Sequence, residues 1–94
     1  MLVLFYFRWV GSSDEFNECI ARVKSIADEV DGIDFKGVFV PTSEWNAVTL
    51  WEAPSFDSAL EVYRTYIRKH GPHPKMTVSK AELLYTFKEL GYPQ

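Results

Sequence analysis

The sequence predicts an α+β fold in which a four-stranded antiparallel sheet carries two helices on one face. Runs rich in strand-forming residues alternate with longer amphipathic segments in the order strand, helix, strand, strand, helix, strand. The chain has 94 residues, which are too few for a second hydrophobic core, so these elements share one domain. Two strand–helix–strand halves of this kind usually combine into a single sheet.

Composition restricts the class of protein. Hydrophobic residues make up 47% of the chain and aromatic residues 16%, which excludes a disordered or low-complexity protein. The single cysteine excludes an intramolecular disulfide framework and fits a reducing compartment. The net charge of −3 argues against a general nucleic-acid binder. No run approaches the roughly 20 apolar residues of a membrane span, and none has the layout of a signal peptide. We therefore expect a cytoplasmic protein without nucleic-acid or membrane partners.

The first strand and helix have clear local signals. Residues 2–10 are almost entirely apolar or aromatic and too short for a confident helix, so they are predicted to form a strand. Ser12 and Glu15 have the spacing of a capping box, which starts a helix. Apolar residues then recur every three or four positions as far as Val30. Gly32 is predicted to end this helix, because glycine tolerates the left-handed cap conformation.

The middle of the chain predicts a hairpin followed by a second helix. Residues 33–40 and 45–52 favour strands, and the proline-led turn at 41–44 joins them. An amphipathic segment then runs over residues 54–70, and its last turn is basic, which complements the helix dipole. Gly71 is predicted to end this helix.

The C-terminal segment supports two interpretations. Residues 75–78 suggest a fourth strand. Ser79 and Glu82 repeat the capping-box spacing, and apolar residues follow at helical steps. Against this, every second residue from 81 to 87 is apolar, as in a strand. We favour a short strand followed by a helix over about residues 80–90.

These elements predict the ferredoxin-like βαββαβ fold, with a core over residues 1–78 and a C-terminal helix and tail over residues 79–94. A sheet with one wet face should alternate apolar and polar residues. The first strand does not alternate in this way, so its second face is expected to meet a second copy of the chain or, in part, the C-terminal helix. The apolar residues on its two faces are Val3, Phe5, Phe7 and Trp9 on one and Leu2, Leu4 and Tyr6 on the other.

The stretch from Ser43 to Leu60 resembles the dimeric α/β-barrel superfamily, which includes small antibiotic-biosynthesis-monooxygenase-like and uncharacterised stress-related proteins. It looks like that family's third strand ending in an acidic residue, followed by a helix of the S-x-x-A-L kind. The opening strand and the helix around Phe16 fit as well, so the resemblance covers roughly residues 1–78. It implies a homodimer in which two sheets pack face to face. Activities in the superfamily range from cofactor-free oxygenation, haem-linked chemistry and lactone isomerisation to none known.

Three residues are candidates for catalysis. His70 and His73 lie three positions apart and are able to act as metal ligands or as an acid–base pair. A metal site needs three or four ligands, and no Cys, Asp or Glu lies close by in the sequence, so no metal site is expected. Arg8 interrupts an apolar strand and has to pair, reach water or bind an anion. Asn46 is a more plausible neighbour for it within one chain than Glu52. For all three candidates the structural interpretation is favoured.

Several aromatic residues are candidates for lining a pocket for a small apolar or aromatic ligand. Packing in the core or at a dimer interface is the favoured alternative, because aromatic side chains supply much of the buried area there. Trp51 in particular is predicted to be structural. Cys19 falls on the apolar face of the first helix and is expected to be an inert buried thiol. The candidate ligand-binding residues are Tyr6, Trp9, Tyr63 and Tyr66.

Two functional classes remain open. One is an oligomeric module without catalytic activity that binds a small apolar or aromatic ligand as a sensor or regulatory protein. The other is a small cofactor-independent enzyme of the monooxygenase or isomerase type. A pocket that holds His70 or His73 near Arg8 and a tyrosine would favour the enzyme, and a packed interior would favour the module. We expect the module, without a cofactor, because the sequence shows no acid–base constellation.

Overall fold

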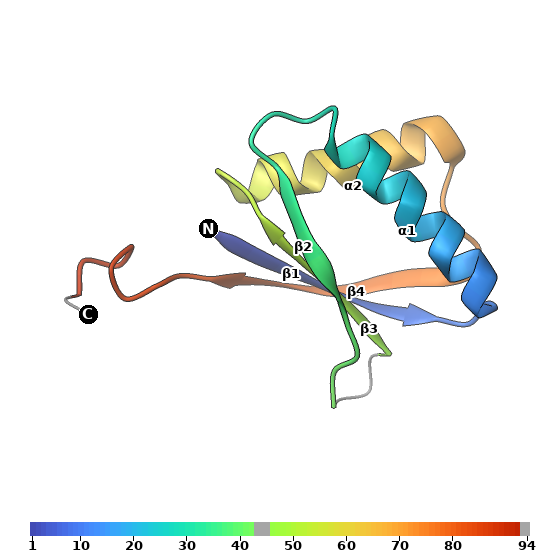
Figure 1. Cartoon of the computed structure of the whole chain (residues 1–94), viewed down its shortest axis with the longest axis horizontal. Helices are drawn as coiled ribbons and strands as arrows, with labels where there is room; N and C mark the ends of the chain where they lie inside the picture. Colours follow the sequence, from blue (N-terminus) through green and yellow to red (C-terminus); the bar gives the residue numbers. More distant parts are fainter. Residues whose placement is uncertain (43–45, 93–94) are drawn as a thin grey trace.

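The structure is a computed structural model that describes residues 1–42 and 46–92, with the backbone alone for residues 77–79. The expected turn at residues 41–44 and the expected strand start at Trp45 extend into residues outside this description. The described elements follow the predicted order (Figure 1). Their bounds are β1, Leu2–Trp9; α1, Ser13–Ala27; β2, Asp34–Phe39; β3, Ala47–Glu52; α2, Phe56–His70; and β4, Met76–Leu84.

The described strands form one antiparallel sheet in the order β2-β3-β1-β4, and both described helices lie on the same face of it (Figure 1). The α+β class is therefore confirmed, and the arrangement is compatible with the ferredoxin-like fold. β1 and β3 occupy the centre of the sheet, while β2 and β4 are its edges.

Side-chain caps start both helices. In α1 the Ser12 hydroxyl accepts from the Glu15 backbone N–H at 3.1 Å, and the Glu15 carboxylate accepts from the Ser12 N–H at 3.1 Å. This reciprocal pair is the predicted capping box. α1 ends at Ala27 rather than near Val30, because the backbone bonds after Ala27 tighten from four-residue to three-residue spacing.

The predicted helix over residues 80–90 is wrong in its first half, where β4 continues to Leu84. The reason is long-range: β1 has an outer edge, and β4 pairs along it from Trp9 and Met76 to Leu2 and Leu84. A helix there would leave the backbone groups of that edge without a partner strand. The described residues beyond Leu84, 85–92, pair with no strand, and residues 87–91 form turns rather than a helix.

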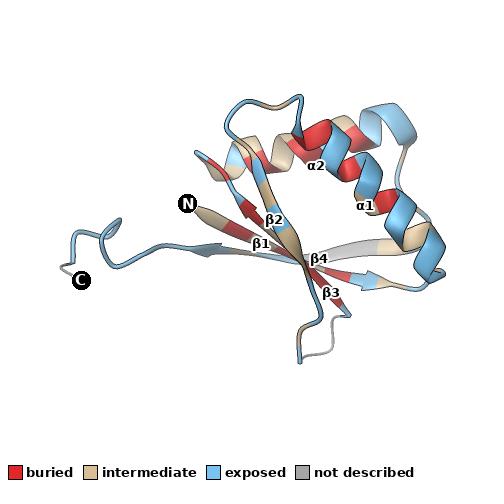
Figure 2. Ribbon diagram, viewed as in Figure 1, coloured by how far each residue is buried: buried red, intermediate tan, exposed pale blue. Residues whose placement is uncertain are grey.

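The core lies between the sheet and the helices, where the buried residues of β1, β3, α1 and α2 face one another (Figure 2). Cys19 and Trp51 are both in this core, as predicted. The Trp51 indole N–H donates to the Thr49 hydroxyl at 2.9 Å, and its ring meets the edge of Phe35 at 4.7 Å between centroids. The buried polar end of Trp51 is therefore satisfied.

The sheet face away from the helices, called here the open face, has an apolar centre between charged borders, where Lys36 pairs with Glu52 and Lys80 with Glu82. Leu4 lies opposite Leu50, and Tyr6 lies opposite Val48 in the register of β1 and β3. Leu4, Tyr6 and Leu50 are only partly buried, and neither helix covers them (Figure 1). Neither helix in the described part of the chain is long and apolar enough to cross a membrane.

Candidate functional site

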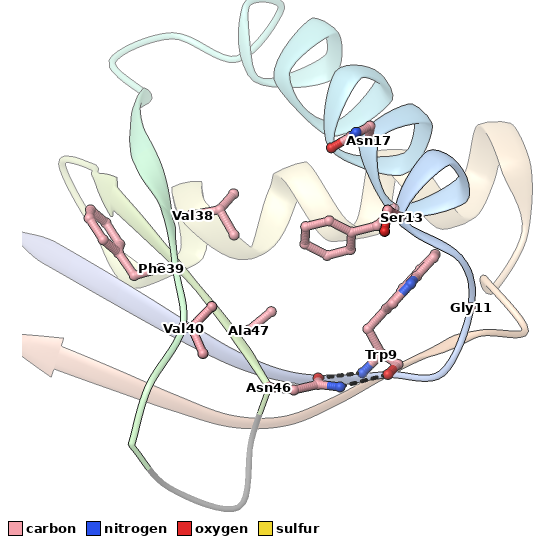
Figure 3. Close-up of a pocket in the computed structure, with 10 residues that line it drawn as sticks. Trp9, Gly11, Ser13, Asn17, Val38, Phe39, Val40, Asn46 and Ala47 are labelled. Atoms are coloured by element: carbon pink, nitrogen blue, oxygen red, sulfur yellow. Dashed lines mark hydrogen bonds between the residues drawn. The ribbon is translucent and has the colours of Figure 1, made fainter.

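A pocket of about 300 Å³ opens between the start of α1 and the end of the sheet where β1 and β2 finish and β3 begins (Figure 3). It is therefore bounded by segments that are far apart in the sequence. Its described lining consists of Trp9, Gly11, Ser13, Phe16, Asn17, Val38, Phe39, Val40, Asn46 and Ala47.

Asn46 holds the end of β1 in place. Its side-chain Oδ1 accepts from the Trp9 backbone N–H at 2.7 Å, and its Nδ2 donates to the Trp9 carbonyl at 2.7 Å (Figure 3). The carboxamide thus extends the pairing of β1 and β3 one step past the last backbone pair, Phe7 and Ala47. This clamp fixes the backbone from which the Trp9 ring projects toward α1.

The Trp9 ring is held on two sides. Its Nε1–H donates to the Ser12 carbonyl at 3.0 Å, and its ring meets Phe16 edge-on at 5.2 Å between centroids. The His73 ring lies 4.9 Å from it. Gly11 permits the close approach of the loop, since a Cβ there would lie 2.9 Å from the Trp9 ring. The indole is therefore an ordered wall of the pocket.

The pocket lining is polar in places but carries no ionisable side chain among its described residues. Ser13 and Asn17 are exposed at the start of α1, and Figure 3 shows Asn17 above the pocket. Two titratable side chains, His73 and Glu15, contact Trp9 and Ser12 from outside this lining. The pKa of Glu15 is lowered chiefly by the hydrogen bond that it accepts from the Ser12 N–H. Such a lining suits an uncharged ligand.

Behind the pocket wall lies a group of buried polar side chains. Thr49 follows Ala47 on the same face of β3, and Cys19 follows Phe16 one helical turn later. The Cys19 sulfur lies 3.6 Å from the Tyr66 hydroxyl. Together with Tyr63, these residues form a small polar layer within an otherwise apolar core.

The Tyr63 hydroxyl is buried without a hydrogen-bond partner among the described residues. Its ring packs against Phe5 and Phe7, with centroids at 4.6 and 5.8 Å. Burial raises the pKa of the Tyr63 hydroxyl well above its ordinary value. The Thr49 hydroxyl lies near enough to offset this in part, but it does not meet the geometry of a hydrogen bond to Tyr63. Tyr63 is therefore a neutral hydroxyl held in the core.

The other candidate residues from the sequence are dispersed. Tyr6 lies on the open face, where its hydroxyl donates to Glu82 at 2.6 Å, and this bond raises the pKa of the hydroxyl. Arg8 is exposed and, by strand alternation, faces away from the pocket side of Trp9. His70 is exposed at the end of α2 and lies against Tyr66, 5.1 Å between ring centroids. Asn46, the neighbour expected for Arg8, hydrogen-bonds to the backbone of Trp9, which follows Arg8 in β1.

Of the catalytic candidates, only His73 packs its ring against the Trp9 ring. His73 is nevertheless not one of the residues that line the pocket. Its Nδ1 accepts from the Lys75 backbone N–H at 3.1 Å, which gives it a structural contact within its own loop. Sequence reasoning identified Trp9 as a ligand-binding candidate but missed Phe16, Val38 and Asn46 in that role. Asn46 carried a signal: asparagine is disfavoured in strands, so one at a strand start indicates a special contact.

No group of three or more His, Cys, Asp or Glu side chains within the described ranges is arranged so that it could hold a metal ion. A scan against protein-family models and a search of curated proteins each found no match to the chain.

Proposed function

We propose that the protein is a homodimeric ligand-binding module whose pocket takes a small, uncharged, apolar or aromatic molecule, in the manner of a sensor or regulatory protein. The observation that carries the proposal is the pocket beside Trp9, with its aromatic wall and its described lining free of ionisable groups. A volume of about 300 Å³ is at the lower limit of ligand pockets in proteins. The ligand is correspondingly small, on the scale of a fused pair of aromatic rings.

Three features support this ligand class. The ordered Trp9 and Phe16 rings offer faces and edges for aromatic contacts. Val38 and Ala47 supply apolar surface from two neighbouring strands. The Asn17 side chain is exposed and belongs to the pocket lining, so its carboxamide is placed to orient one polar group of a ligand.

Homodimerisation is part of the proposal because the open face is apolar and uncovered in the single chain. Leu2, Leu4 and Leu50 lie on it beside Tyr6. Large apolar patches left in water are rare on monomeric proteins. The resemblance to the dimeric α/β-barrel superfamily points to the same face, since members of that superfamily pair their sheets.

The ligand site is tested by titrating 2-naphthol into uniformly ¹⁵N-labelled protein and following the amide and indole N–H resonances. We expect saturable shifts of the Trp9 indole N–H and of the start of α1. Phe16→Ala should abolish these shifts. Phe56→Ala is the matched control, because it removes another half-buried ring that is not part of the pocket lining. This ring stacks on Phe5, with 6.3 Å between the two centroids, and binding should persist without it. Shifts confined to the open face, or equal loss in both variants, would contradict the proposed site.

The enzyme alternative has weaker support. A pocket between the sheet and a helix is the location that it requires, and the pocket beside Trp9 has that location. Acid–base catalysis also needs a titratable side chain within hydrogen-bond reach of the substrate. None of the described lining residues supplies one, so the binding module is the function that we propose.

A further inference from the structure

The segment after β4, residues 85–92, carries apolar side chains that have little of their own chain to pack against; it is called the C-terminal arm below. It extends away from the sheet and helices (Figure 1). Phe87 is 67% exposed, Leu90 57% and Tyr92 61%. So large an apolar surface on a projecting segment indicates an interaction surface.

The arm has a defined local structure rather than an open-ended tail. The Thr86 hydroxyl accepts from the Glu89 N–H at 3.0 Å, and the Glu89 carboxylate accepts from the Thr86 N–H at 3.1 Å. The Tyr92 N–H donates to the Phe87 carbonyl at 2.8 Å, and the two rings meet edge to face at 5.9 Å. A segment folded in this way loses less conformational entropy when it binds.

A second exposed apolar pair lies at the diagonally opposite corner of the sheet. Phe39 is 51% exposed at the end of the edge strand β2, and the adjoining Val40 is 81% exposed. Both residues also line the pocket beside Trp9, so a docked arm would cover one side of that pocket. The arm leaves the other edge strand, β4, at the end of the sheet where Leu84 pairs with Leu2. Phe39, the last residue of β2, pairs with Val48 of β3, and Val48 pairs with Tyr6 of β1. Phe39 therefore lies farther along the sheet than the end from which the arm leaves.

We propose that the C-terminal arm of each chain docks on the Phe39–Val40 corner of a second copy, so that the two copies clasp each other. This inference rests on the homodimer proposed above. The arm and the Phe39–Val40 corner lie at the two ends of one diagonal of the sheet. When two sheets pack open face to open face about a twofold axis that runs along the second diagonal, each arm comes to lie at the Phe39–Val40 corner of the partner. The strands of the two sheets then cross nearly at right angles, which is one of the two favoured ways for sheets to pack.

The apolar area is sufficient for a stable dimer. Tyr85, Phe87, Leu90 and Tyr92 of the arm, with Leu84 at the end of β4, are 45–67% exposed. Together they present roughly 500 Å² of apolar surface per chain. Two arms, the corners that receive them and the apolar centre of the open face together bury on the order of 1,500 Å², the size of a standard protein–protein interface. Because a twofold axis relates the two contacts, they use up both arms and both corners of the dimer. The assembly is therefore a closed dimer and does not grow into fibres.

A disulfide experiment tests the docking directly. Cys19 is buried and is replaced by Ala, and Val40→Cys and Leu90→Cys are combined in that chain. The sheet alone separates its two edges by roughly 14 Å, while a disulfide needs Cα atoms within about 7 Å, so only a bond between chains is possible. We expect a covalent dimer under mild oxidation, and none with Leu90→Cys alone. If the double variant stays non-covalent, the docking is wrong.

The contribution of the arm is measured by sedimentation. Replacing Phe87 and Leu90 together by Ser should raise the dimer dissociation constant at least about 30-fold, as expected for loss of a hot spot. Lys88→Ser, between them, is the matched control and should leave the constant unchanged. If the dimer dissociation constant of the double variant is unchanged, the proposed docking of the arm is wrong, but the homodimer through the open face is not contradicted. A parent chain that is monomeric overturns both. The 2-naphthol titration tests the pocket separately when it is made in the Phe87→Ser, Leu90→Ser variant, where the arm no longer competes for Phe39 and Val40.

Discussion

At the scale of single residues, the Tyr63 hydroxyl is the clearest energetic cost in the described core. It is buried, it has no hydrogen-bond partner within the described chain, and an unsatisfied group of this kind costs about 1–3 kcal/mol. Tyr63→Phe should therefore raise the free energy of unfolding by about 1 kcal/mol, or Tm by about 4–8 °C. Thermal unfolding measures this. Tyr66→Phe is the control and should not stabilise, because it loses a hydroxyl that contacts the Cys19 sulfur at 3.6 Å. A destabilised Tyr63→Phe would mean that the hydroxyl is satisfied in solution.

Trp51 is the largest of the fully buried side chains in the described chain, at 1% exposure. Trp51→Ala should cost about 3–5 kcal/mol and lower Tm by more than about 10 °C. Trp51→Phe should be much milder, since it keeps most of the ring contact with Phe35 and loses the bond to Thr49. Melting curves of both variants beside the parent decide the matter. An alanine variant that melts like the parent would show that this ring does not stabilise the core.

At the scale of elements, local signals predicted the helix starts and failed at the C-terminus. Ser12 with Glu15 and Ser79 with Glu82 have the same capping spacing, yet only the first pair starts a helix. The second pair lies where β1 offers an unpaired edge, and the gain from pairing that edge depends on a strand some 75 residues away in sequence. The alternation of residues 81–87 was the correct signal as far as Leu84, where β4 ends.

The candidate site was predictable only in part for the same reason. Trp9 is an aromatic residue at a strand end, and the sequence identified it as a ligand-binding candidate. Phe16, Val38 and Asn46 become neighbours of Trp9 only when three strands and α1 assemble. Their sequence pattern marks them as helix or strand residues, and no spacing rule connects them to the pocket.

The capping box of α1 gives a pH dependence. The hydrogen bonds from Ser12 hold the pKa of Glu15 below its ordinary value of 4.5 in the folded chain. A lowered folded pKa contributes stability above the unfolded value, and this contribution is lost as the pH falls through the folded pKa. The parent should therefore exceed Glu15→Gln in Tm at pH 7, and the difference should shrink below about pH 4.5. Melts of the two proteins from pH 7 to pH 3 test this; a difference independent of pH would contradict it.

At the scale of the whole molecule, the two central strands carry apolar residues on both faces of the sheet, and the described helices cover only one of these faces. The helix expected over residues 80–90 was the intramolecular alternative for covering the open face. Because residues 80–84 lengthen the sheet instead, that alternative is removed over those residues and the open face is enlarged. The apolar row at Leu4 and Leu50 is then best covered by a second copy.

The last prediction concerns that row. The parent should sediment as a dimer at micromolar concentration, and Leu4→Lys should sediment as a monomer of 10.9 kDa, because the charge would be buried unpaired in the interface. Its circular dichroism should remain that of the parent, since Leu4 faces away from the helices. Ile67→Lys is the matched control: it places the same charge on an apolar residue of α2 that is 52% exposed, and it should remain dimeric. If Leu4→Lys stays dimeric, or if both variants dissociate alike, the copies do not meet through the open face.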